Sequence, residues 1–228
     1  ELLTHEVTLP HGFGDKSYPY SYEETISRLS GQFQRIAQEI DALPPAACPD
    51  DYAVELFTLH PAFLAKSYFP DAFLSAANLV SVGSRNTTVI PEKEVRPSTK
   101  KEKTTTQLFI AGKRQAFRSL SAGIAQYTTD SQEALDIRKI ERVDIHDPIV
   151  AVPSSSLSSA SFFELGLHLL PGADPAIIQS ALLSYASSVG VELFIDTSFY
   201  AGNLWFLPAR GTSESIKRLS RFCFMRVI

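Results

Sequence analysis

The stretch FFELGLHLLPGADPAIIQSALLSYASSVGVELFI, residues 162–195, decides the fold because its hydrophobic period changes from one segment to the next. Apolar side chains alternate with polar residues or glycine over 163–169, which is typical of a strand with one buried face. The Asp-Pro pair at 174–175 predicts the start of a helix. Gly190 predicts its end, because glycine readily adopts the left-handed conformation found there. Alternation returns over 191–196 and predicts a second strand.

The residues that follow complete the pattern. A Gly-Asn pair at 202–203 predicts a tight turn into the apolar run 204–207. A Gly-Thr pair at 211–212 predicts the start of a short helix, and 222–228 is predicted to be a last strand. Strand, helix, strand, strand, helix, strand is the order of a ferredoxin-like unit. We therefore expect residues 161–228 to form four antiparallel strands backed by two helices.

The alternation assigns the side chains of this unit to two faces. Leu165, Leu193 and Ile195 fall on the face expected to pack against the helices. The opposite, open face carries two phenylalanines among acidic residues and a histidine, which suits a protein interface better than bare solvent. The expected interface residues are Phe162, Glu164, His168, Phe194 and Asp196. The alternative is that the first unit, residues 51–147, or the helix expected at 21–41 covers this face.

Residues 1–50 are expected to form an extended arm, packed on the body by its tyrosines, followed by one long helix. A capping pattern begins at Ser21, and a Pro-Pro pair at 44–45 ends the helix. Apolar residues at helical spacing give the helix one hydrophobic face. These residues are Ile26, Leu29, Phe33, Ile36 and Ile40.

Residues 51–147 repeat the order of the last unit. The elements expected are strand 52–60, helix 70–79, strand 79–90, strand 104–112, helix 113–126 and strand 135–145. A Ser-rich linker at 148–160 joins this unit to the next. The predicted fold class is therefore α+β, with two tandem ferredoxin-like units after an arm and an amphipathic helix.

Composition bounds the partners and the compartment. A formal net charge of -4 argues against a dedicated nucleic-acid or membrane-surface binder. No apolar run approaches the ~18 residues that a membrane span requires. Cys48 and Cys223 are too few and too far apart in the sequence for a disulfide framework or a metal site, so a reducing cytoplasm is the expected compartment. The chain has no initiator Met and ends in an apolar strand, so we expect it to be part of a longer protein.

The sequence predicts no catalytic residue, metal site or cofactor within this chain. Subtilisin-like fragments at His11, Asp196 and Ser213 come in the wrong order for a triad of that kind. The histidines form no i, i+4 pair with a carboxylate at ligand spacing, and no glycine-rich phosphate loop is present. The run 108–112 resembles the first signature strand of RNA-recognition domains, but 135–146 contains no aromatic residue to complete such a site.

One constellation is richer in chemistry than a core requires. The segment 60–70 combines two prolines, a lysine and several aromatic residues, and a second short motif follows at 82–85. A tightly packed crossover and a functional contact explain it equally well. The residues singled out, without an assigned role, are His60, Lys66, Tyr68, Phe69 and Arg85.

These two segments, together with the arm 9–20, also carry a resemblance. They resemble the amino-terminal region of a bacterial group of subtilisin-like serine peptidases, of the type encoded beside an AAA ATPase and implicated in defence against phage. The resemblance covers most of this chain and stops before any catalytic domain. It implies that the catalytic Asp, His and Ser lie beyond Ile228. Subtilisin propeptides resemble a ferredoxin-like unit whose open sheet face docks on the catalytic domain.

The resemblance implies a non-catalytic, propeptide-like region that acts as a folding aid, inhibitor or regulatory dock. Its expected partner is its own or a separate subtilisin-like catalytic domain, with an AAA ATPase as a further expected partner. No nucleic-acid or membrane partner is expected. The alternative is a free-standing ferredoxin-like adaptor that binds an ATPase partner or a small ligand. The coding sequence downstream of Ile228 separates these two hypotheses.

Overall fold

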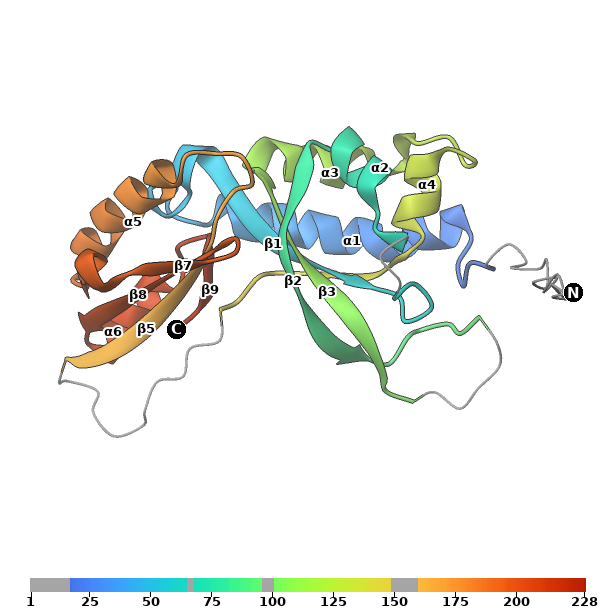
Figure 1. Ribbon diagram of the computed structural model, residues 1–228. Helices are drawn as coiled ribbons and strands as arrows, with labels where there is room; N and C mark the ends of the chain where they lie inside the picture. Colours follow the sequence, from blue (N-terminus) through green and yellow to red (C-terminus); the bar gives the residue numbers. More distant parts are fainter. Residues whose placement is uncertain (1–16, 65–67, 96–100, 149–159) are drawn as a thin grey trace, which may run out of the picture.

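The computed structural model describes residues 17–64, 68–95, 101–148 and 160–228, which form two antiparallel sheets backed by helices (Figure 1). The elements of the first part are α1 (Tyr22–Asp41), β1 (Tyr52–Leu59), α2 (Asp71–Ala76), β2 (Leu79–Val89), β3 (Lys103–Lys113), α3 (Arg114–Gly123), α4 (Gln132–Ile137) and β4 (Ile140–Asp144). Those of the second part are β5 (Ser161–His168), α5 (Pro175–Val189), β6 (Glu192–Leu193), β7 (Phe199–Ala201), β8 (Leu204–Gly211), α6 (Ser213–Leu219) and β9 (Met225–Val227). Short 3-10 turns lie at Pro45–Ala47, Pro49–Asp51, Ile124–Gln126 and Ile195–Thr197.

The strand order confirms the predicted fold class. The first sheet has the order β2-β3-β1-β4 and the second has β6-β8-β5-β9, with β7 added beside β8. In each sheet the first and third main strands lie in the centre and all pairs are antiparallel, as in a ferredoxin-like unit. The β2–β3 hairpin extends well below the helices of the first unit (Figure 1).

Helix α1 forms where the sequence predicts it and covers the helix side of the first sheet. Ser21 caps it: the Ser21 hydroxyl accepts from the Glu24 N–H, and the Glu24 carboxylate accepts from the Ser21 N–H. Its apolar stripe, including Leu29 and Phe33, packs with α2, α3 and α4 in one hydrophobic core with the sheet. Helix α1 therefore packs on its own unit, which rules it out as the cover of the open face of the second sheet. Residues 1–16 of the predicted arm lie outside the described residues.

The predicted strand 135–145 is wrong in its first half. Residues Gln132–Ile137 form α4, which Ser131 caps, and the strand begins only at Ile140. Asp136 explains the difference, because its carboxylate accepts hydrogen bonds from the backbone N–H groups of Ala72 and Phe73 at the start of α2. A helix places Asp136 against α2, and this long-range contact outweighs the local alternation that favours a strand.

The predicted strand 191–196 is also shorter than expected. Only Glu192–Leu193 pair with β8, and a 3-10 turn follows at Ile195–Thr197. The Phe194 N–H donates to the Pro208 carbonyl at 3.0 Å, but Pro208 has no N–H to return the bond, so the ladder ends there. Leu193 and Ile195 are consequently half-buried at the margin of the core, whereas Leu165 is fully buried as predicted.

One of the two hydrophobic clusters contains residues of both units. The face of the first sheet opposite its helices contributes Val54, Leu56 and Phe109 to the same cluster as Leu165 and Trp205 of the second unit. Hydrogen bonds reinforce the join: Cys223 N–H donates to the Ala47 carbonyl, and the His146 side chain donates from Nε2 to the Met225 carbonyl at 2.5 Å. The open face of the first sheet is therefore closed in part by the second unit.

Candidate functional site

The open face of the second sheet carries the strongest candidate surface. The register of β5 and β8 sets Phe162 opposite Arg210, Glu164 opposite Pro208 and Gly166 opposite Phe206. Across the β7–β8 hairpin, Phe199 lies opposite Phe206. Because paired residues share a face, these side chains line one surface of the sheet. We call Phe162, Phe194, Phe199, Phe206 and Val227 the aromatic face.

The rings of the aromatic face meet in pairs. Phe162 and Phe194 lie 5.6 Å apart between ring centroids, and Phe199 stacks on Phe206 at 5.2 Å. Gly166 makes room for this arrangement, since a Cβ there would stand 3.1 Å from the ring of Phe206 and 2.8 Å from Val227. Phe162 is 70% exposed and Phe199 55% exposed. These large apolar rings therefore remain exposed to solvent although each packs against another ring.

Two shallow hollows flank the stretch Phe162 to Glu164 on this face. One continues toward Gly166, Phe206 and Val227, and the other toward Phe199 and Pro208. Charged groups stand among the rings: Glu164 is exposed, and the guanidinium of Arg210 lies 6.0 Å from the centre of the Phe162 ring. The surface thus combines apolar hollows with charges of both signs, as protein interfaces do at their rims.

The structure brings together three of the five predicted interface residues: Phe162, Glu164 and Phe194. Asp196 is exposed but lies in the 3-10 turn after the sheet. The prediction for His168 is wrong, because this residue is fully buried. It points to the predicted side of the sheet, but the first unit covers that end.

The first unit approaches His168 through Phe109 and Gly83. The His168 and Phe109 rings lie 4.4 Å apart, and a Cβ at Gly83 would stand 3.3 Å from the imidazole. Sequence reasoning missed Phe199 and Phe206. The two-residue turn at 202–203 could have predicted that they lie side by side. It fixes the pairing of Ala201 with Leu204, and therefore the pairing of Phe199 with Phe206 two residues further along each strand.

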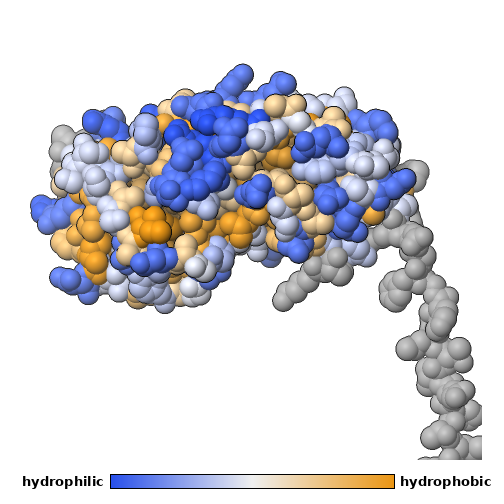
Figure 2. All heavy atoms as spheres, turned by 90° about the horizontal axis from the view of Figure 1, so that it is seen from above, coloured by the Kyte–Doolittle hydropathy of each residue, from blue (hydrophilic) through white to orange (hydrophobic). Residues whose placement is uncertain are grey.

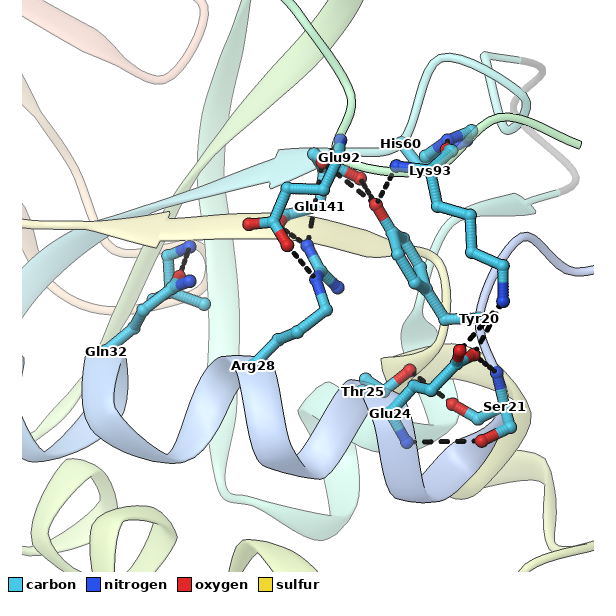
Figure 3. Close-up of polar contacts among 11 residues, drawn as sticks. Tyr20, Ser21, Glu24, Thr25, Arg28, Gln32, His60, Glu92, Lys93 and Glu141 are labelled. Atoms are coloured by element: carbon cyan, nitrogen blue, oxygen red, sulfur yellow. Dashed lines mark hydrogen bonds and ion pairs between the residues drawn. The ribbon is translucent and has the colours of Figure 1, made fainter. Parts of the chain in front are cut away.

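The end of the arm is fixed by a buried polar cluster (Figure 3). The Tyr20 hydroxyl donates to the carboxylate of Glu141 at 2.9 Å and accepts from the N–H of Lys93 at 3.1 Å. Burial, followed by the Glu141 charge, raises the pKa of Tyr20. The guanidinium of Arg28 lies 3.8 Å from the centre of the Tyr20 ring, and its Nε donates to Glu92. The cluster therefore joins the end of the arm, α1, β4 and the loop after β2.

His60 belongs to the same corner and has a structural role there. Its Nδ1 accepts from the N–H of Ala62 at 3.0 Å, so its Nε2 carries the proton and donates to the Lys93 carbonyl at 3.0 Å. Burial lowers the pKa of His60. Tyr68 packs on Phe63 with ring centroids 5.5 Å apart. These contacts match the packed-crossover interpretation of 60–70.

The remaining motif residues lie elsewhere. Phe69 is partly exposed, and Lys66 lies outside the described residues. Arg85 lies on the face of the first sheet opposite its helices, where its Nε donates to Gln107 at 2.8 Å. The structure therefore separates Arg85 from His60, and these residues do not form one site.

Arg85 instead belongs to a cluster at the join between the units. Arg85 and Arg226 lie 5.3 and 4.7 Å from the centre of the Phe109 ring, and both His146 and His168 contact that ring. Burial, with the positive charge of Arg226 nearby, lowers the pKa of His168 to about 3. Burial likewise lowers the pKa of His146 to about 4. Both imidazoles are therefore neutral at physiological pH.

The two cysteines, which are distant in sequence, meet at the same join. Both are free and buried. A hydrogen bond from Cys223 lowers the pKa of the Cys48 thiol, while burial raises that of Cys223. The two thiols are thus neighbours in space although they are far apart in the sequence, and they form no disulfide. Among the described residues, no group of three or more His, Cys, Asp or Glu side chains is arranged to hold a metal ion.

No helix in the described part of the chain is long and apolar enough to cross a membrane. Fold and surface together define an α+β protein of two ferredoxin-like units with an exposed aromatic sheet face. Comparison with protein-family models, curated proteins and solved structures gave no significant match to this chain.

Proposed function

We propose that this chain is the non-catalytic, propeptide-like docking region of a subtilisin-like serine peptidase that serves in defence against phage. The observation that carries the docking role is the aromatic face, where Phe162 and Phe199 stay more than half exposed on an open sheet. The peptidase partner comes from the sequence resemblance. Subtilisin propeptides likewise resemble a ferredoxin-like unit that docks on the catalytic domain through its open sheet face.

The energetics favour an interface at this surface. Two exposed phenylalanines on adjacent hollows offer the large, rigid apolar contacts that dominate binding energies. While the two rings stay in solvent they contribute no hydrophobic stabilisation, which amounts to roughly 25 cal/mol for each Å² of apolar area that is buried. The paired rings are already in place, so binding would order few side chains.

The test is a titration of the chain against the separately produced catalytic domain, read as inhibition of fluorogenic peptide cleavage. Phe162→Ala with Phe199→Ala should weaken binding at least roughly tenfold, because truncated interface aromatics commonly cost ~2 kcal/mol or more. Both side chains lie on the surface, so the thermal unfolding midpoint should stay close to wild type.

The control removes two exposed apolar side chains from the helical side. Seen from above, hydrophobic residues gather over the second unit, where α5 lies (Figure 2). Ile177 and Leu183 of α5 are 45% and 46% exposed. Ile177→Ala with Leu183→Ala should leave inhibition unchanged. Inhibition lost only in this control pair would move the dock to α5, and a wild-type chain that never inhibits or binds the catalytic domain would refute the proposed function.

The adaptor hypothesis predicts a different result in the same assay. The wild-type chain would fail to bind the catalytic domain but would bind the AAA ATPase encoded beside it. Under the docking proposal, the chain alone hydrolyses neither casein nor the peptide panel. Turnover that disappears in Ser213→Ala would overturn this expectation. Ser213 is nearly buried in the first turn of α6, behind the Thr212 cap, which is a poor position for a nucleophile.

A further inference from the structure

A pocket of about 330 Å³ opens between the two units, away from the aromatic face. Its walls come from the end of α1, from β1, from residues 145–148 and from the turn between α6 and β9. Apolar side chains line much of it, among them Leu43, Val54, Ile145 and Phe222. This volume suits a small organic molecule.

Glu55 is the buried polar group of this pocket. It interrupts the apolar strand β1, and only 3% of the residue is exposed. Among the described residues, the carboxyl group receives one hydrogen bond, from the His146 N–H to Oε2 at 2.8 Å. Oε1 has no partner there, although it belongs to a residue that lines the pocket. A donor that enters the pocket can therefore bond to Oε1 without displacing a hydrogen bond from the described residues.

The charges around Glu55 select the sign of that ligand. The acidic residues Glu39 and Asp147 line the pocket with Glu55, against a single arginine, Arg221. Arg221 is already engaged, because its guanidinium donates to the Ala42 carbonyl at 3.0 Å. His146 is neutral, since burial lowers its pKa to about 4. The pocket therefore favours a positive charge on a short apolar body.

We propose that this pocket binds a small organic cation, an ammonium or guanidinium group on a short apolar stem, with Glu55 as its counter-ion. The apolar walls take the stem, and Oε1 accepts the hydrogen bond of the charged head. The pocket and the aromatic face share no residue, so this site is independent of the docking proposal.

The proposal predicts a definite pH dependence. In the free protein, burial raises the pKa of Glu55 to about 8, with the charges of Glu39, Asp144 and Cys48 acting in the same direction. The carboxyl is therefore protonated at pH 7, and it must release its proton when an ammonium group binds. The other titratable or charged groups facing this site are His146, Asp147, Arg221 and Cys223. Affinity should rise up to roughly tenfold per pH unit below pH 8 and level off above it, while the amine keeps its charge.

The experiment is calorimetric titration of the whole chain with n-pentylamine, pentan-1-ol and pentanoate, which share a stem and differ in charge. The amine should bind at least roughly tenfold more tightly than the alcohol or the acid. Titration in buffers of different ionisation enthalpy should reveal release of a proton near pH 7. Equal binding of amine and alcohol would mean that the pocket is merely apolar, and an amine that does not bind at millimolar concentration would overturn the proposal.

Two variants assign the effect to Glu55. Glu55→Gln keeps the shape and the acceptor for the His146 N–H but cannot ionise, so amine affinity should fall at least roughly tenfold and lose its pH dependence. Glu192→Gln, at an exposed site that does not line the pocket, should change amine affinity by less than about threefold, because solvent screens an exposed charge. The reverse order of the two effects would contradict the assignment. Should Glu55→Gln fail to fold, Leu43→Trp fills the pocket and should abolish amine binding while Glu55 remains.

Discussion

At the scale of single residues, the join between the units depends on two imidazoles that must stay neutral. His168 and His146 have pKa values near 3 and 4 in the folded protein, against an ordinary value of 6.5. Below pH 6.5 the unfolded chain therefore binds more protons than the folded one. Their contribution to the free energy of unfolding is complete above pH 6.5, and it falls as the pH drops toward 4.

Urea unfolding of wild type and His168→Gln over this pH range measures the effect. Glutamine is polar and does not titrate. The free energy of unfolding of the variant should therefore depend less steeply on pH, by the contribution of about one proton, up to ~1.4 kcal/mol per pH unit. Glu55 acts in the opposite direction above its ordinary pKa, but it is the same in both proteins and cancels in the difference. Parallel pH profiles for the two proteins would show that His168 titrates normally.

Tyr20 provides a second test at this scale. Tyr20→Phe leaves the Glu141 carboxylate and the Lys93 N–H without their shared partner. An unpaired buried group costs ~1–3 kcal/mol, so the urea midpoint should fall accordingly. Tyr18→Phe is the control, because the structure shows a ring contact with Phe63 but no hydrogen bond of its hydroxyl to the described residues. Equal effects of the two substitutions would contradict the structural role of the Tyr20 hydroxyl.

At the scale of elements, short sequence patterns predicted the helix ends, because interactions between neighbouring residues determine them. The capping pattern at Ser21, the Asp-Pro pair at 174–175 and Gly190 mark helix ends within one or two residues of those found. The strand order followed from the sequence of elements. Among the misassigned segments, 135–139 and 194–196 have their deciding contact with a residue far away in the sequence. No local periodicity records such a contact.

Asp136 tests this explanation for α4. It caps α2 and pairs with Lys139 at 2.6 Å, and both residues are almost fully buried. Asp136→Ala leaves a buried ammonium unpaired and α2 uncapped, so the free energy of unfolding should fall by ~3–5 kcal/mol. Asp130→Ala, at an exposed site, should change it by less than about 0.5 kcal/mol. A small effect of Asp136→Ala would show that the contact with α2 does not determine α4.

The margin of the second sheet gives a graded prediction. Leu165 is fully buried in a central strand, whereas Leu193 is half-buried where β6 ends. Leu165→Ala should cost ~2–5 kcal/mol, and Leu193→Ala should cost clearly less because less area is lost from the core. Urea midpoints of the two variants measure the order. A larger effect at Leu193 would mean that β6 extends further than two residues.

At the scale of the whole molecule, the sequence predicted two units but not their join. The candidate face was partly predictable, because strand alternation placed Phe162, Glu164 and Phe194 on one side. His168 failed, because alternation gives the side of a sheet and not what covers it. Glu55 left a signal, a lone charge in an apolar strand, but its pocket needs residues from four separate parts of the chain.

The shared core predicts that the two units unfold together. Phe109 belongs to the first sheet and is fully buried against the second unit, while Trp205, the only tryptophan, is buried in the second unit. Phe109→Ala should cost ~3–5 kcal/mol, a large share of the ~5–15 kcal/mol that stabilises a typical domain. Tryptophan fluorescence reports the second unit, and far-UV circular dichroism reports both.

The decisive control is Phe117→Ala, which opens a cavity on the helix side of the first sheet, away from the join. If the chain unfolds as one cooperative body, this substitution should lower the Trp205 midpoint by the same amount as the circular-dichroism midpoint, although Phe117 and Trp205 belong to different hydrophobic clusters. A Trp205 midpoint that stays at the wild-type value while the circular-dichroism transition splits would show two independent domains. The join would then be a weak contact, and the pocket at Glu55 would open and close with it.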